Sequence, residues 1–125
     1  MRRLVLLLLP FVLAGCDSLG FDSIDFGDPY TLSPGIAPEL DDEGENLLMT
    51  VTYTGGCENH RFSLRSRGSG DNVDLWFEHN DAGDDCEGRV TTNLSAPIPS
   101  EALSADRVSV LVPGGLLFVV RDGSD

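Results

Sequence analysis

Residues 61–79 read RFSLRSRGSGDNVDLWFEH, and this stretch decides the fold class because it repeats one pattern on both sides of a short polar turn, GSGDN. Apolar side chains recur at every second position, which is typical of strands with one face in a core and the other in water. These apolar residues are Phe62, Leu64, Val73, Leu75 and Phe77. The stretch therefore predicts two neighbouring strands.

Similar segments occur on either side of this stretch. Residues 47–54 (LLMTVTYT) are rich in β-branched and aromatic side chains and end at two glycines, and residues 88–94 (GRVTTNL) also favour a strand. Residues 107–112 and 116–121 flank a Pro-Gly-Gly turn, which indicates a hairpin. Residues 100–106 (SEALSAD) predict one helical turn.

Short strands without a long amphipathic helix predict an all-β fold, a small antiparallel β-sandwich or barrel. A chain of 125 residues has the size of one domain. The candidates for its core are Val51, Phe62, Leu64, Val73, Leu75, Phe77, Val90, Val110, Leu117 and Val119.

The chain begins with the order of features found in a secretory signal peptide. Arg2 and Arg3 precede an apolar stretch from Leu4 to Leu13. This stretch is too short for a membrane-spanning helix of about 20 residues. We therefore expect residues 1–15 to be a signal peptide that is removed.

The four residues around the expected cleavage point, Leu13-Ala14-Gly15-Cys16, resemble the lipobox of bacterial lipoproteins at every position. The resemblance implies diacylglycerol on the Cys16 sulfur, cleavage before Cys16 and acylation of the new amino terminus by chains such as palmitate. It also implies a lipid-anchored protein of the bacterial cell envelope, on the inner or outer membrane, with its domain in the periplasm or at the cell surface. No cofactor is expected apart from this covalent lipid.

Residues 16–44 are rich in Asp, Gly, Pro and Ser and have no sustained periodicity, so they predict a flexible, lipidated acidic tether before a β-domain at residues 45–125. Spaced apolar residues would alternatively let part of this segment pack as an edge strand. They are Phe21, Ile24, Phe26, Tyr30 and Leu32.

The charge balance narrows the choice of partners. The chain has 21 acidic and 8 basic residues, a formal net charge of −13. Removal of Arg2 and Arg3 with the signal peptide leaves 6 basic against 21 acidic residues, or −15. Because phosphate binding depends on clusters of Lys and Arg, nucleic acid is not expected as a partner.

Two cysteines remain once Cys16 is assigned to lipid. In an oxidising compartment Cys57 and Cys86 are expected to form a disulfide. By chain-entropy reasoning, a loop of this size stabilises the fold by about 3 to 4 kcal/mol.

Each of these cysteines also has a histidine near it, so Cys57, Cys86, His60 and His79 are a possible tetrahedral zinc set. The spacing departs from the usual CxxC and HxxxH clusters. Alternatively, the two histidines pack beside the disulfide on adjacent antiparallel strands and form local hydrogen bonds.

The polar loop before Cys86 carries enough oxygen ligands to suggest a calcium site. Its acids are Asp81, Asp84, Asp85 and Glu87. They lack the spacing of an EF-hand, and a solvated acidic turn would have the same composition.

The strings GGCENHRF and HNDAGDDCEG within residues 55–88 resemble small envelope lipoproteins of the NigD-like type. This resemblance implies a β-domain closed by a disulfide. No GxSxG, HExxH, P-loop or dinucleotide-binding motif is present, so the chain is not expected to be an enzyme. The sequence predicts a structural or interaction module with a possible envelope protein partner, and a metal-binding lipoprotein as the alternative.

Overall fold

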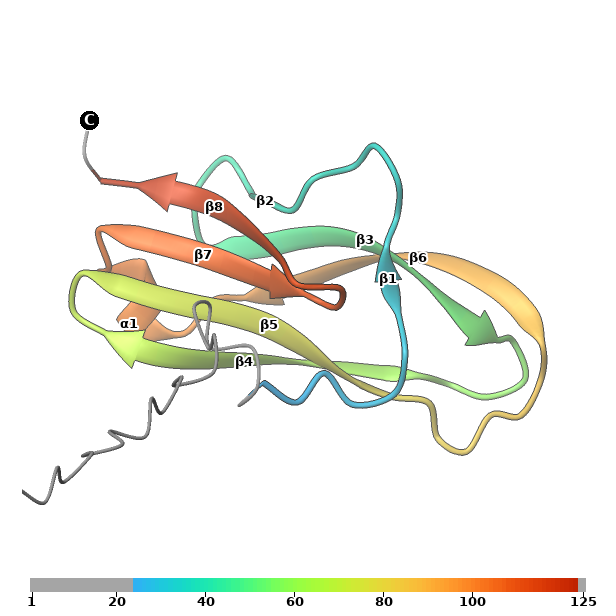
Figure 1. The fold of residues 1–125 in the computed structure, drawn as a ribbon. Coiled ribbons are helices and arrows are strands. Elements are labelled where there is room, and N and C mark those ends of the chain that lie inside the picture. Colours follow the sequence, from blue (N-terminus) through green and yellow to red (C-terminus); the bar gives the residue numbers. More distant parts are fainter. Residues whose placement is uncertain (1–23, 124–125) are drawn as a thin grey trace, which may run out of the picture.

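A computed structural model, which describes residues 24–123, shows a sandwich of two four-stranded β-sheets (Figure 1). The predicted all-β class is confirmed, and the two separate sheets make it a sandwich rather than a barrel. One short helix, α1 (Ser100–Leu103), follows the last strand of one sheet, where the sequence predicts a helical turn. No helix within residues 24–123 is long and apolar enough to cross a membrane.

The first sheet has the order β4-β5-β7-β8. It consists of β4 (Arg61–Ser69), β5 (Asn72–Asn80), β7 (Arg107–Val112) and β8 (Leu116–Asp122). The pairs β4–β5 and β7–β8 are antiparallel hairpins, as the alternating patterns and their turns predict. The middle pair, β5–β7, is parallel.

The second sheet is built on β3 (Asn46–Gly55). One edge of β3 pairs along its whole length with β6 (Gly88–Pro97). The other edge pairs with two short strands, β1 (Thr31–Leu32) and β2 (Glu39–Leu40). Every pair in this sheet is antiparallel.

Residues 24–44 belong to this sandwich, so the prediction that the whole of 16–44 is a tether was wrong. The chain enters beside β5, where Gly27 bridges to His79, and it then crosses to β3 as β1. Residues 31–32 and 39–40 pair with β3, so the alternative prediction, that part of this segment packs as an edge strand, is correct. Each pairing covers only one or two residues, which is too short to leave a periodic pattern in the sequence.

Tyr30 fixes the crossing between the sheets. Its side chain is buried, and its hydroxyl donates a hydrogen bond to the carbonyl oxygen of Phe77 at 2.6 Å. Burial raises the pKa of this hydroxyl, so it remains a donor. A segment with such an anchor is part of the core rather than a flexible linker.

The core lies between the sheets and confirms half of the predicted core residues as buried. These are Val51, Val73, Leu75, Phe77 and Val110. Phe62 and Leu64 pack against the core while partly exposed, and Val90 is partly exposed.

The prediction for β8 was wrong, because Leu117 and Val119 are 41% and 48% exposed. Their neighbours Phe118 and Val120 face the core instead. Side chains alternate between the two faces of a strand, so choosing the wrong alternate set places every residue on the wrong face. The five consecutive apolar residues 116–120 (LLFVV) do not indicate which alternate set faces the core.

This correction predicts different costs for two truncations. Leu75→Ala removes a fully buried side chain and should lower the free energy of unfolding by about 2 to 5 kcal/mol. Val119→Ala should change it by less than about 0.5 kcal/mol, as expected for an exposed position. Urea unfolding of both variants measures the difference, and a large loss in the Val119 variant would contradict the assigned faces.

Candidate functional site

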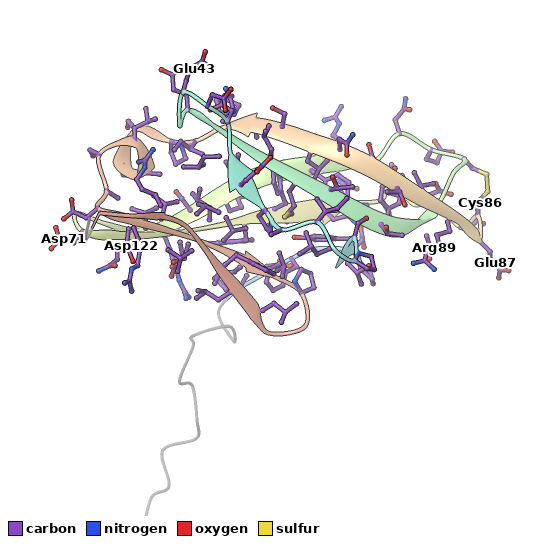
Figure 2. The ribbon with its side chains drawn as sticks, turned by 90° about the horizontal axis from the view of Figure 1, so that it is seen from above. Glu43, Asp71, Cys86, Glu87, Arg89 and Asp122 are labelled. Atoms are coloured by element: carbon purple, nitrogen blue, oxygen red, sulfur yellow. A yellow bond between two sulfur atoms is a disulfide. The ribbon has the colours of Figure 1, made fainter. Side chains whose placement is uncertain are left out.

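The predicted site residues gather at one end of the sandwich, where β3 ends and β6 begins. Cys57 and Cys86 form the predicted disulfide there, with Cα atoms 6.0 Å apart. Figure 2 shows Cys86 at the end of the molecule opposite Asp71 and Asp122. Cys16 lies outside the described residues.

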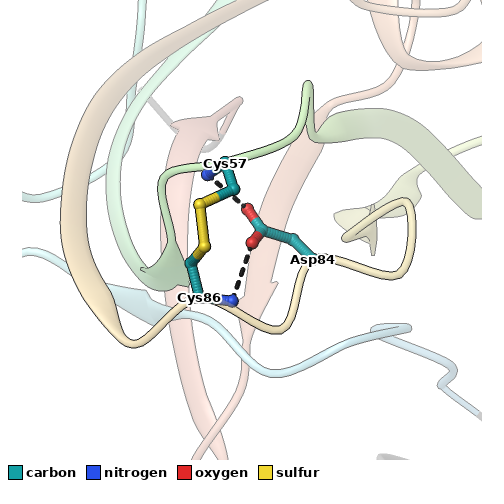
Figure 3. Close-up of side chains that lie close together, drawn as sticks. All are labelled: Cys57, Asp84 and Cys86. Carbon is teal, nitrogen blue, oxygen red and sulfur yellow. Dashed lines mark hydrogen bonds between the residues drawn. A yellow bond between two sulfur atoms is a disulfide. The ribbon is translucent and has the colours of Figure 1, made fainter.

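Asp84 is the central acceptor of this end. One oxygen, Oδ2, accepts hydrogen bonds from the backbone N–H groups of Gly56, Cys57 and Glu58 at 2.9, 3.0 and 3.1 Å. The other, Oδ1, accepts one from the N–H of Cys86 at 3.0 Å. Figure 3 shows the carboxylate reaching both halves of the disulfide loop. It therefore pairs donors of a turn that has no strand beside it.

His60 donates from Nε2 to the same Asp84 oxygen at 2.8 Å. The two side chains are only 1% and 0% exposed. The hydrogen bond from His60, followed by those from the backbone, holds the pKa of Asp84 well below its usual range. The acid is therefore a buried carboxylate.

A second histidine extends the chain of hydrogen bonds. Nδ1 of His60 lies 2.7 Å from Nε2 of His79, and Nδ1 of His79 lies 3.0 and 3.2 Å from the carbonyl oxygens of Asp28 and Pro29. Carbonyl oxygens only accept, so His79 donates from Nδ1. The bond between the rings needs a proton between Nδ1 of His60 and Nε2 of His79.

Aromatic rings cover both imidazoles. Tyr53 stacks on His60 with ring centroids 4.2 Å apart, and Phe62 stacks on His79 at 4.3 Å. Tyr30 meets His79 edge-on at 5.9 Å. Water is thereby kept from the hydrogen bonds, which strengthens them.

Close packing against Asp84 and His60 requires a glycine at position 55, just before this turn. A Cβ atom there would lie 2.6 Å from both the Asp84 carboxylate and the His60 ring. Only a residue without a side chain lets the backbone pass this close.

The zinc set is not assembled, because its two cysteines are bonded to each other and all four ring nitrogens of His60 and His79 have hydrogen-bond partners. The local packing of the two histidines beside the disulfide matches the alternative drawn from the sequence. Sequence reasoning missed the carbonyls of Asp28 and Pro29, because they lie about fifty residues away and carry no side-chain signal.

The four acids of the proposed calcium loop do not converge. Asp84 points inward, whereas Asp85 and Glu87 are exposed and Asp81 accepts a hydrogen bond from the N–H of Gly83. Within residues 24–123 the only three potential ligands at metal-binding distance are Cys57, Asp84 and Cys86. A disulfide offers no thiolate to a metal, so this cluster is not a metal centre.

Comparison of the chain with protein-family models gives no match, and comparison with curated proteins gives none either. The likeness of residues 55–88 to NigD-like lipoproteins therefore stays a prediction. The geometry of the site indicates its role. A buried carboxylate and two histidines are joined by hydrogen bonds, and the carboxylate holds the backbone of the disulfide loop in place.

Replacing the central acceptor tests this geometry. In Asp84→Asn the side chain has no negative charge to accept the hydrogen bond from His60, and its NH₂ group, itself a donor, faces one of the backbone N–H donors. The melting temperature should therefore fall by several degrees. Asp85→Asn, at an exposed neighbouring position, is the matched control and should shift it little. Equal shifts in the two variants would contradict the assigned role of Asp84.

The lowered pKa of Asp84 also predicts an acid dependence of stability. The usual value for this group is 3.8, and in the fold it is lower. The carboxylate therefore stabilises the fold fully above 3.8, and this contribution is lost as the pH falls from there toward the folded value. The difference in unfolding midpoint between wild type and Asp84→Asn should be greatest near neutral pH and shrink in acid. A difference that stays constant in acid would count against the assignment.

Proposed function

We propose that the chain is a lipoprotein of the bacterial cell envelope that is anchored by acyl chains on Cys16 and presents a rigid, non-catalytic β-sandwich as a structural or interaction module. Its partners would be the membrane, through the lipid, and another envelope protein. The metal-binding alternative is not carried further, because neither candidate ligand set is assembled.

The observation that carries the proposal is how the three cysteines are divided. Cys57 and Cys86 are paired with each other, which leaves Cys16 as the remaining cysteine of the sequence. Cys16 is also the residue that completes the lipobox-like Leu-Ala-Gly-Cys string. Disulfides persist in exported proteins, so the pairing and the signal-like amino terminus agree on the compartment.

The non-catalytic role is supported by the closure of the histidine cluster. A general acid or base must reach the proton of its substrate. Here the rings of His60 and His79 are buried beneath aromatic residues, and their nitrogens bond to one another, to Asp84 and to backbone carbonyls. Such a cluster stabilises a fold and offers no exposed reactive group.

Acyl labelling tests the anchor. The full precursor is expressed in a bacterial host that is fed an alkyne-bearing fatty acid, and the chain is then analysed by intact mass spectrometry. We expect a mature chain that starts at an acylated Cys16, and no label in Cys16→Ala. Ser18→Ala, two residues after Cys16, is the matched control and should remain labelled. A mature wild-type chain without acyl groups would overturn the proposal.

A further inference from the structure

Because residues 24–44 belong to the sandwich, the domain lies close to the proposed anchor. The described chain starts at Ile24, eight residues after Cys16. Even fully extended, eight residues span only about 28 Å. A domain held on so short a connection lies beside the bilayer, and the place where the chain enters the fold influences which face is turned toward it.

The chain enters beside β5 of the first sheet, where Gly27 bridges to His79. Trp76 belongs to the outer face of this sheet, because its neighbours Leu75 and Phe77 point into the core. Its indole Nε1–H donates a hydrogen bond to the carbonyl oxygen of Asp25 at 3.2 Å. The first described residues therefore run beside a partly exposed tryptophan, a side chain that favours the interface between lipid and water.

Two more apolar side chains share this face. Leu117 and Val119 on β8 point away from the core and are 41% and 48% exposed. Leu117 pairs with Leu111 of β7, which is fully buried and therefore adds no exposed surface. An exposed leucine and valine on the same sheet face as a partly exposed tryptophan give this face a surface that water solvates poorly.

The charge of this face also differs from that of the whole chain. Six arginines follow Cys16, and four of them lie on the outer face of the first sheet: Arg61, Arg65, Arg67 and Arg107.

Three of these arginines form ion pairs with acids of the same sheet. Arg65 pairs with Glu78 at 3.5 Å, Arg67 with Asp74 at 3.0 Å and Arg107 with Asp122 at 3.5 Å. The strands of this face therefore carry no excess of negative charge, in a chain whose net charge is −13. Anionic headgroups would repel most of this protein, and would repel this face least.

The outer face of the second sheet is different. It presents polar side chains that bond to one another across strands, as Thr50 does to Asn93 at 2.7 Å. An apolar hollow lined by Ile36, Ala37 and Leu48 lies beside them. The loop between β2 and β3 adds the acids Asp42, Glu43 and Glu45, which anionic headgroups would repel.

We propose that the outer face of the first sheet lies against the lipid bilayer, with Trp76, Leu117 and Val119 at the level of the headgroups. The proposal rests on the lipid anchor proposed above. It assigns the domain an orientation: the first sheet faces the membrane, and the second sheet faces away from it.

Trp76 is the single tryptophan of the chain and therefore reports on this contact directly. The mature, lipidated protein is reconstituted into phosphatidylcholine vesicles, with and without bromine on the acyl chains, and tryptophan fluorescence is measured. We expect quenching by the brominated lipid. In the double variant Leu117→Ser with Val119→Ser, at least half of this quenching should be lost while the protein still floats with the vesicles.

The matched control replaces two equally exposed apolar residues that lie away from this face. Ile36 in the loop after β1 and Leu103 in α1 are 50% and 47% exposed. The double variant Ile36→Ser with Leu103→Ser should keep the wild-type quenching. An equal loss of quenching in this control would overturn the assignment to one face.

Two negative results separate the orientation from the anchor. An acylated protein that floats with vesicles but is not quenched by brominated lipid would overturn the proposed face alone. Persistent protection of Trp76 from iodide in detergent would then indicate coverage by a second copy or by residues 17–23. A protein without acyl groups on Cys16 that does not float would overturn the anchor, and the orientation with it.

Discussion

The hydrogen bonds of Asp84 are the interaction on which one end of the sandwich depends. The turn after β3 has three consecutive backbone donors and no strand beside it, and one carboxylate oxygen accepts from all three. Because a single buried carboxylate accepts all three hydrogen bonds, it holds the turn in one geometry. The Cys57–Cys86 disulfide holds the same loop covalently, so the chemical cross-link and the hydrogen bonds stabilise one geometry.

The two histidines extend this constraint across the molecule. His60 bonds to Asp84, and His79 bonds to the carbonyls of Asp28 and Pro29, so the disulfide loop is linked to the segment that enters the fold. That segment lies along β5, on the first sheet. The buried cluster therefore helps to fix where residues 28–30 join the sandwich. Under the orientation that we propose, the same cluster would influence which face is turned toward the membrane.

Much of the fold could be predicted from local patterns, because residues 61–79 alternate between apolar and polar side chains on both sides of a turn. The prediction failed where the sequence does not alternate. The stretch LLFVV in β8 has no polar residue to show which side chains face the core, and β1 and β2 are too short to alternate, since each pairs over two residues. At the site, the nearness of the two histidines to the disulfide was predictable. The role of Asp84 was not, since a carboxylate that accepts from backbone donors and one that binds calcium look alike in a sequence.

The most direct test of the account is NMR of the histidine ring nitrogens in isotope-labelled protein. The account predicts slowly exchanging protons on Nε2 of His60 and on Nδ1 of His79, together with a third proton shared between the two rings. Slow exchange is expected because the rings are covered and hydrogen-bonded. Ring protons that exchange rapidly with water, with both histidines in mixed tautomers, would contradict the buried chain from Asp84 to His79.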